Sequence, residues 1–184
     1  MGKSAVFLDR DGTINIDYGY VFRKDKFVYI DGVVNGLKKL NELGYVLVII
    51  SNQSGIARGM YSEDDYKNLT SWMIEDLANN GVNIERTYYC PHLKEGSVKK
   101  YAIDCNCRKP KTELFYRAKN ELNLDFKGSY AIGDRLRDLS ICDETSVKGI
   151  LIGDNVKEDS YPYVRAKTWD EVLEIIMNDS LAVK

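Results

Sequence analysis

The sequence lacks both a long hydrophobic run and a strong charge imbalance. No apolar stretch approaches the ~20 residues that a membrane-spanning helix needs. The first residues, MGKSAVFLDRDG, have no apolar core of the kind found in signal peptides. A net charge of −2 argues against a nucleic-acid surface and against a polybasic membrane anchor. We therefore expect a cytoplasmic protein with reduced thiols, without nucleic-acid or membrane partners.

Histidine is also scarce, since His92 is the only one in the chain. A histidine nucleophile or a Ser-His-Asp arrangement would have to use this residue, which lies two positions after Cys90. A cysteine-based phosphate loop, with arginine six positions after its cysteine, is absent as well. The residues at that distance from the four cysteines are Gly96, Lys111, Glu113 and Lys148. These absences leave aspartate as the candidate nucleophile.

Short apolar runs alternate with helical patterns along the chain, which predicts one domain over residues 1–184. We predict strands over 5–8, 45–50, 84–89, 129–132, 148–152 and 163–166. Helices are predicted from Val33 to Gly44 with Asp31 as N-cap, from Ser62 to Gly81, and over 112–122, 136–144 and 169–177. This alternation is typical of a doubly wound α/β fold with a mainly parallel sheet. The gap after the first strand is too short for a large cap domain.

Polar and acidic residues directly follow the predicted strands. Asp9 and Asp11 come after the first strand, and an extended chain would point them to one side and Arg10 to the other. Asp134 follows another strand, and the carboxyl ends of parallel strands meet at one edge of a sheet. Three converging carboxylates need a cation, and oxygen ligands favour Mg²⁺. Asp9 could then attack phosphorus while Asp11 exchanges protons, with Ser51 and Lys109 steadying the phosphoryl group.

With these motifs in order, the sequence resembles phosphatases of the haloacid dehalogenase superfamily, which have a Rossmann-like core. The strings DRDGTIN, DYGYV, SNQSGIARG, YYCPH, CNCRKP and IGDRLRD resemble those of the D-glycero-D-manno-heptose 1,7-bisphosphate 7-phosphatases. This resemblance implies a monomeric, Mg²⁺-dependent enzyme of bacterial heptose biosynthesis that removes the 7-phosphate of a sugar bisphosphate.

The resemblance also implies roles for individual residues. Asp9 would be the nucleophile and Asp11 the acid/base, and Mg²⁺ would bind Asp9, the Asp11 carbonyl and Asp134. Arg135 stands where we expect lysine, so its substrate contact stays open. The residues expected to bind substrate are Asp17, Tyr18, Gly19, Tyr20, Ser51, Asn52, Gln53, Ser54, Arg108, Lys109 and Arg135. For Arg58, a solvated loop charge and a substrate contact remain equal alternatives.

Cys90, His92, Cys105 and Cys107 have the spacing of a closed tetrahedral Zn²⁺ site, in a loop over about 90–107. Such a site is structural, and it would hold Arg108 and Lys109 toward the substrate. The alternatives are chance cysteine pairs or a disulfide. Cys142 is expected to be a small buried hydrophobic residue. Arg137 and Asp138 are expected to be an exposed charge and an indirect partner of the metal, respectively.

Two other functions stay open. Histidinol-phosphate phosphatases share the zinc loop and the motifs, although the DYGYV and SVKK strings favour the heptose substrate. A phosphosugar-binding protein without activity is the alternative from another class, which the intact Asp9, Asp11 and Lys109 disfavour.

Overall fold

A computed structural model describes residues 2–153 and 163–182. Six strands form one parallel sheet in the order β3-β2-β1-β4-β5-β6. The strands are β1 Lys3–Leu8, β2 Val46–Asn52, β3 Ile84–Cys90, β4 Leu124–Gly133, β5 Lys148–Ile152 and β6 Val164–Ala166. The predicted doubly wound α/β fold is confirmed, and the sheet is wholly parallel among the described residues.

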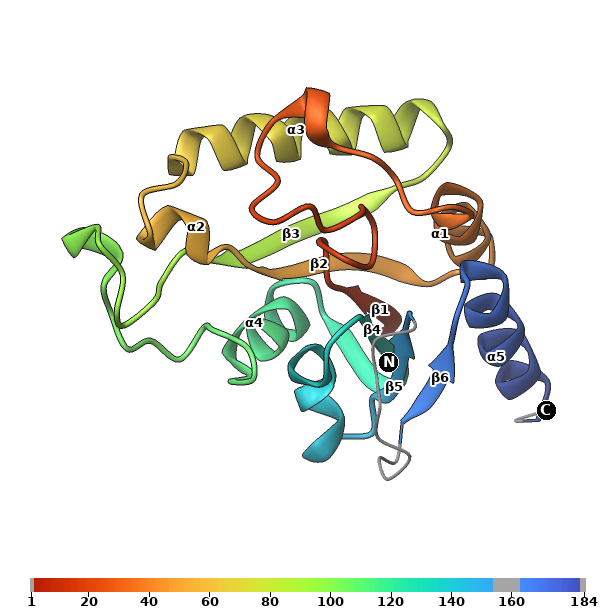
Figure 1. Cartoon of the computed structure of the whole chain (residues 1–184). Coiled ribbons are helices and arrows are strands. Elements are labelled where there is room, and N and C mark those ends of the chain that lie inside the picture. Colours follow the sequence, from red (N-terminus) through yellow and green to blue (C-terminus); the bar gives the residue numbers. More distant parts are fainter. Residues whose placement is uncertain (1, 154–162, 183–184) are drawn as a thin grey trace.

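Helices cover both faces of the sheet (Figure 1). Helices α1 Val33–Glu42, α3 Glu63–Asn79 and α5 Trp169–Ala182 pack on one face, and α4 Glu113–Glu121 and the 3₁₀ helix η3 Leu136–Asp143 on the other. The short elements α2 Ser54–Ala57, η1 Lys24–Lys26 and η2 Lys99–Tyr101 lie in the connections. No helix in the described part of the chain is long and apolar enough to cross a membrane.

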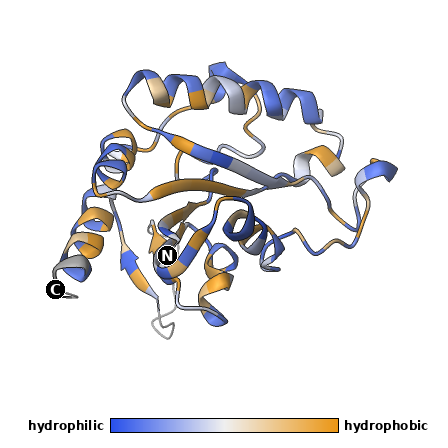
Figure 2. Cartoon of the chain, turned by 180° about the vertical axis from the view of Figure 1, so that it is seen from behind, coloured by the Kyte–Doolittle hydropathy of each residue, from blue (hydrophilic) through white to orange (hydrophobic). Residues whose placement is uncertain are grey.

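The apolar strand residues alternate between the two cores, as a parallel sheet covered on both faces requires. In β1, Val6 and Leu8 face α1, α3 and α5, whereas Ala5 and Phe7 face α4 and η3. Figure 2 shows hydrophobic residues dominating much of the sheet, while the long helix α3 alternates hydrophobic and hydrophilic segments. The burial of both sheet faces explains why the strands were readable as apolar runs.

Several element boundaries differ from the predictions. The N-cap of α1 is Gly32 in a left-handed conformation (φ 77°), so the prediction of Asp31 is wrong. Strand β4 begins five residues earlier than predicted, at Leu124. Directly after this added segment, the buried Ser129 hydroxyl accepts a hydrogen bond from the Ala5 amide at 2.8 Å. The segment over 136–143 is a 3₁₀ helix rather than an α-helix. Helix α3 starts with a capping box, in which the Ser62 side chain accepts from the Asp65 amide and the Asp65 carboxylate accepts from the Ser62 amide.

The C-terminal helix supports the first strand's loop directly. Trp169 at the start of α5 is fully buried, and its indole Nε1 donates a hydrogen bond to the Thr13 carbonyl at 3.0 Å. Gly36 of α1 gives the indole room, because a Cβ there would lie 2.6 Å from Trp169 Cε3. Helix α5 therefore helps to position the turn that follows β1.

Candidate active site

The site lies where the strand order reverses. Strands β1 and β4 are neighbours in the sheet, and the chain moves outward from them in opposite directions, which opens a crevice at their carboxyl ends. Asp9 follows β1, Ser51 lies near the end of β2, and Asp134 follows β4. A cavity of about 350 Å³ opens above them. The fold thus brings the sequence-predicted strand-end residues together.

Lys109 is buried beneath this cavity. Its Nζ lies 2.8 Å from Asp9 Oδ1 and 2.8 Å from Asp138 Oδ1, and it donates to the Ile50 carbonyl at 2.6 Å. Asn52 holds the Lys109 backbone, since its side-chain amide donates to the Lys109 carbonyl and accepts from the Lys109 amide, both at 3.0 Å. The ammonium therefore points at the carboxylates with little freedom to move.

Asp9, Asp134 and Asp138 bring their carboxylate oxygens within 4.8 Å of one another. Burial, and then the charge of Asp138, raises the pKa of Asp9 to about 7 and that of Asp134 to about 6. Among the described residues, one oxygen of Asp134 is buried and has no hydrogen-bond donor. Besides Lys109, the Arg135 Nε lies 3.6 Å from Asp134 and the Arg137 Nε lies 3.9 Å from Asp138. The buried Asp134 oxygen has none of these donors, which suits a metal ligand. The residues present fit a Mg²⁺ ion.

Two glycines make this clustering possible. Gly12 has φ +85°, and a Cβ at this position would lie 2.4 Å from Asp134 Oδ2. A Cβ on Gly133 would lie 2.3 Å from the Cβ of Asp138. Any larger residue at either position would push a carboxylate away from the cluster.

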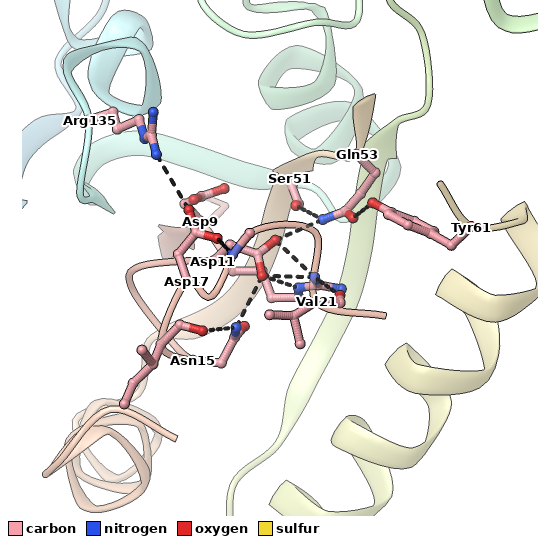
Figure 3. A network of polar contacts seen from close by, with 12 residues as sticks. Asp9, Asp11, Asn15, Asp17, Val21, Ser51, Gln53, Tyr61 and Arg135 are labelled. Atoms are coloured by element: carbon pink, nitrogen blue, oxygen red, sulfur yellow. Dashed lines mark hydrogen bonds and ion pairs between the residues drawn. The ribbon is translucent and has the colours of Figure 1, made fainter. Parts of the chain in front are cut away.

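Asp11 is held by a separate set of donors (Figure 3). The Arg10 guanidinium donates to both of its oxygens, at 2.8 and 2.9 Å, while Asn15 Nδ2 donates to Oδ1 at 3.0 Å and Gln53 Nε2 to Oδ2 at 3.2 Å. The prediction that Arg10 points away from Asp11 is wrong. β1 ends at Leu8 and the chain then turns, so Arg10 folds under its neighbour.

Arg10 also fixes the loop that borders the cavity. It is 1% exposed, and its guanidinium donates to the Val21 carbonyl at 2.6 Å. In the same loop the Asp17 carboxylate accepts from the Gly19 amide at 2.9 Å, and Gly19 and Tyr20 both have positive φ, 80° and 55°. This compact turn places Asp17, Gly19 and Tyr20 at the cavity wall.

Most of the predicted substrate-side residues line the cavity, but not all. Ser51 and Lys109 are buried below it, and Tyr18 is 62% exposed and outside its lining. Sequence reasoning did not select Tyr61 or Arg137, and left Arg58 open. All three join the lining, which consists of Asp9, Asp11, Asp17, Gly19, Tyr20, Asn52, Gln53, Ser54, Arg58, Tyr61, Arg108, Arg135 and Arg137.

Four arginines therefore surround the cavity. Arg135 contacts Asp17 at 3.4 Å and Asp134 at 3.6 Å, and Arg137 Nε lies 3.9 Å from Asp138 Oδ1. Arg108 donates to the His92 carbonyl at 3.3 Å. So many cations around one opening favour a ligand with more than one anionic group. Arg137, expected to be merely an exposed charge, belongs to this wall.

The cysteines and the histidine converge on one point beside the cavity. Cys105 Sγ lies 3.4 Å from Cys90 Sγ and 3.3 Å from Cys107 Sγ, and His92 Nδ1 lies 3.3 Å from Cys107 Sγ. A disulfide needs sulfurs ~2.05 Å apart, so the disulfide alternative is wrong. Edges of 3.3 to 3.9 Å fit the corners of a tetrahedral zinc site. Cys142, which is partly buried, takes no part in this cluster.

Comparison with known proteins gives this site a family. The chain is 48% identical to the D-glycero-beta-D-manno-heptose-1,7-bisphosphate 7-phosphatase of Yersinia pestis, over 73% of this chain and 72% of that one. It is 50% identical to the enzyme of that name from Haemophilus ducreyi, over 80% and 81% of the two chains. The chain belongs to this phosphatase family. Residues 5–142 also match the family model described as polynucleotide kinase 3 phosphatase.

Solved structures agree with this family. A haloacid-dehalogenase-like phosphatase structure from Mesorhizobium loti superposes with a TM-score of 0.84 at 27% identity, covering 96% of this chain and 87% of that one. A D,D-heptose 1,7-bisphosphate phosphatase from B. bronchiseptica, complexed with magnesium and phosphate, gives 0.80 at 23% identity and covers 96% and 99%. The second likeness is one of fold. The resemblance noted from the motifs is confirmed.

The residues that sequence reasoning missed carry little local signal. Arg10 and Asn15 are polar residues in a turn, and nothing in their spacing reveals that both donate to Asp11. Tyr61 lies eight positions after Gln53 and contacts it only because α2 folds the chain back. The burial of Arg10 is visible only in three dimensions.

Proposed function

We propose that this protein is a Mg²⁺-dependent phosphatase that removes the 7-phosphate of D-glycero-beta-D-manno-heptose 1,7-bisphosphate. The observation that supports the proposal most is the buried pair of Asp9 and Lys109 under a cavity ringed by arginines. The names of the relatives supply the substrate and its beta anomer. The histidinol-phosphate alternative gains no support from these relatives.

In the first step a carboxylate oxygen of Asp9 attacks the phosphorus of the 7-phosphate. A bond forms between Asp9 and phosphorus while the bond from phosphorus to the sugar oxygen breaks. Asp11 gives its proton to the leaving sugar oxygen, so the sugar departs as an alcohol and Asp9 becomes an aspartyl-phosphate.

In the second step water attacks the phosphorus of the aspartyl-phosphate. Asp11, now a carboxylate, accepts the proton of that water, and the bond between Asp9 and phosphorus breaks. Inorganic phosphate leaves and both aspartates return to their starting states. Arg10 and Asn15 hold Asp11 in place through both steps.

Lys109 and Ser51 act on the phosphoryl oxygens. Lys109 donates a hydrogen bond to Asp9. Its positive ammonium would stabilise the negative charge of the phosphoryl oxygens in the transition state. The Ser51 hydroxyl accepts from Gln53, which leaves its own proton for a phosphoryl oxygen.

Asp9, Asp134 and the Asp11 carbonyl would hold Mg²⁺, with Asp138 as an indirect partner through Lys109. When bound, the ion screens the carboxylates from the incoming phosphate and stabilises negative charge on it. Zn²⁺ would bind Cys90, His92, Cys105 and Cys107 as a structural ion without an open position.

The arginine wall would bind the rest of the substrate. Arg108 and Arg135 were the predicted contacts, and Arg58 and Arg137 lie in the same lining. A sugar with a second phosphate at C1 matches this wall better than a ligand with one anionic group. We further propose that the enzyme works as a monomer in the cytoplasm, within bacterial activated-heptose biosynthesis.

The test is phosphate release from the beta and alpha anomers of the heptose 1,7-bisphosphate, from histidinol phosphate and from fructose 1,6-bisphosphate. We expect the highest kcat/KM for the beta anomer, and turnover that depends on Mg²⁺. A preference for histidinol phosphate would refute the substrate. Absence of turnover with all four would favour a phosphosugar-binding protein without activity.

A further inference from the structure

We propose that Tyr61 is a positioning residue that fixes the side-chain amide of Gln53, and through it sets both the acid/base Asp11 and the phosphoryl-binding Ser51. The catalytic consequence of this inference rests on the proposed function. The geometry of the contacts stands apart from it.

The Gln53 side chain is the meeting point of three hydrogen bonds (Figure 3). Its Nε2 donates to Ser51 Oγ at 2.6 Å and to Asp11 Oδ2 at 3.2 Å, and its Oε1 accepts from the Tyr61 hydroxyl at 2.6 Å. Gln53 is 1% exposed, so water does not compete for these bonds. The two hydrogens of the Gln53 amide therefore link Asp11, which follows β1, to Ser51 near the end of β2.

The orientation of this amide decides what the two neighbours can do. In the second step Asp11 is a carboxylate, which accepts hydrogen bonds only, so in that state it requires the nitrogen of Gln53 and is repelled by its oxygen. The nitrogen also fills an acceptor position on Ser51, which leaves the serine proton free to be donated. If the amide turned over, its oxygen would face Asp11 and take the serine proton instead.

Tyr61 supplies the donor that prevents this reversal. Its hydroxyl donates a hydrogen bond to Gln53 Oε1. If the amide turned over, the phenol would have to accept from the amide nitrogen instead, and that nitrogen would no longer reach Asp11 and Ser51. Burial raises the pKa of the Tyr61 hydroxyl, so it stays protonated. The phenol, as a donor to Oε1, therefore acts together with Asp11 and Ser51 to hold the orientation in which the nitrogen faces them.

Tyr61 is itself held by its surroundings. Its ring stacks on Phe22, with centroids 5.1 Å apart and planes 13° apart. Gly55 leaves room for the ring, since a Cβ there would lie 2.1 Å from Tyr61 Cε1. The tyrosine is only 7% exposed, so it offers the amide a fixed partner.

A double-mutant cycle tests the proposal. We expect Tyr61→Phe to lower kcat about 10-fold with little change in KM, and Gln53→Ala to lower it about 100-fold, because two donated bonds are lost. In the Gln53→Ala background, Tyr61→Phe should have no further effect on kcat. If the two effects instead multiply, Tyr61 does not act through Gln53 and the proposal is wrong.

Gln53→Glu tests the donated hydrogen bonds while keeping the size and shape of the side chain. A glutamate keeps an acceptor for Tyr61 but places a second carboxylate against Asp11, so we expect kcat to fall at least as far as in Gln53→Ala. Near-parent kcat in this variant would overturn the role of the donated bonds. Tyr89→Phe is the matched control, since it loses a phenol bond to Glu63 and none to Gln53. It should keep the parent kcat.

Side-chain amide NMR signals give a readout that needs no turnover. The Gln53 NH₂ signals, identified by their loss in Gln53→Ala, should exchange slowly with solvent in the parent and in Tyr89→Phe, and much faster in Tyr61→Phe. Unchanged exchange in Tyr61→Phe would refute the positioning role. A parent that gives the expected NMR result but does not hydrolyse heptose bisphosphate would refute the proposed function and leave the positioning intact.

Discussion

Lys109 and Asp9 stand one hundred residues apart in the sequence, yet the lysine Nζ lies 2.8 Å from the aspartate Oδ1. Both side chains are almost fully buried, and Asp138 shares the same ammonium at 2.8 Å. This pair places a cation beside the proposed nucleophile. It also joins the end of the first strand to the segment directly after the Cys90–Cys107 loop, so the geometry of the candidate site depends on two distant parts of the chain.

Asp9→Asn should abolish turnover without unfolding the protein. An amide is nearly the same size as the carboxylate but cannot form the aspartyl-phosphate, so we expect kcat to fall by roughly 10⁴-fold or more. The melting temperature should be equal to or above that of the parent, because a buried carboxylate in a crowded acidic cluster is removed. Phosphate release and thermal unfolding measure the two effects. Appreciable residual turnover would argue against an aspartyl intermediate.

Lys109→Ala should damage both activity and stability while zinc stays bound. Removing the ammonium leaves Asp9 and Asp138 buried without their cation, which costs about 3–5 kcal/mol of unfolding free energy. We expect kcat to fall at least ~10²-fold. Urea unfolding in Mg²⁺-free buffer and kinetics check this.

The matched control for this prediction is Lys111→Ala. Lys111 also pairs with an aspartate, Asp104, at 2.9 Å, but its side chain is 47% exposed. We expect a much smaller loss of unfolding free energy than in Lys109→Ala, and normal kcat, because solvent screens this exposed pair. Equal losses in the two variants would show that burial of the Lys109 pair does not matter.

Gly12→Ala should weaken Mg²⁺ binding. The added Cβ would lie 2.4 Å from Asp134 Oδ2, so the carboxylate must move away from the cluster. We expect the Mg²⁺ concentration for half-maximal activity to rise at least ~10-fold, measured by Mg²⁺ titration of initial rates.

Gly44→Ala is the control that separates the effect of backbone strain from the effect of the steric clash between the new Cβ and Asp134. Gly44 has a similar φ of +88°, but in the described part of the chain no atom beyond its two sequence neighbours lies within 4 Å of the position that its Cβ would take. It should lose ~1 kcal/mol of stability from backbone strain and keep its Mg²⁺ dependence. If both variants bind Mg²⁺ as the parent does, the collision with Asp134 has no bearing on the metal.

The sequence predicted those parts of the fold that depend on local patterns. Strands β1, β2 and β5 could be predicted from their apolar runs, because both faces of the sheet are covered. Strand β4 was predicted only in its last half, since its first half contains Lys127 and Gly128. Its strand conformation there comes from pairing with β1, which no local pattern records.

The candidate site likewise has a part that local patterns predict and a part that they do not. Asp9, Ser51 and Asp134 could be predicted because strand ends meet at one edge of a parallel sheet. The contacts of Arg10 with Asp11 and of Tyr61 with Gln53 could not, because they depend on how loops fold back and on which way side chains turn. The clustering of the strand-end residues was therefore predicted, and the contacts that orient their side chains were missed.

Cys107→Ser should lose zinc and lower activity through the position of Lys109. Cys107 Sγ contacts two other members of the cluster at 3.3 Å, and Lys109 follows two residues later. We expect about one zinc per chain in the parent, much less in the variant, and a kcat loss of ~10-fold or more. Metal analysis of protein purified without added metal measures this. Cys142→Ser, outside the cluster, should keep both zinc and kcat. Full activity after complete zinc loss would contradict the bracing role of the loop.

Trp169→Phe should destabilise the turn that follows β1 as well as the core. The variant leaves the buried Thr13 carbonyl without its donor and opens a gap beside Gly36. Together these changes should cost about 2–4 kcal/mol of unfolding free energy. Trp72→Phe makes the same chemical change at a partly buried site on α3 and should cost less than ~1.5 kcal/mol. Urea unfolding of both variants gives the comparison.

Because Thr13 belongs to the same turn as Asp11 and Gly12, Trp169→Phe should also lower kcat, whereas Trp72→Phe should not. Equal stability losses with unchanged kcat would show that α5 stabilises the core without supporting the site.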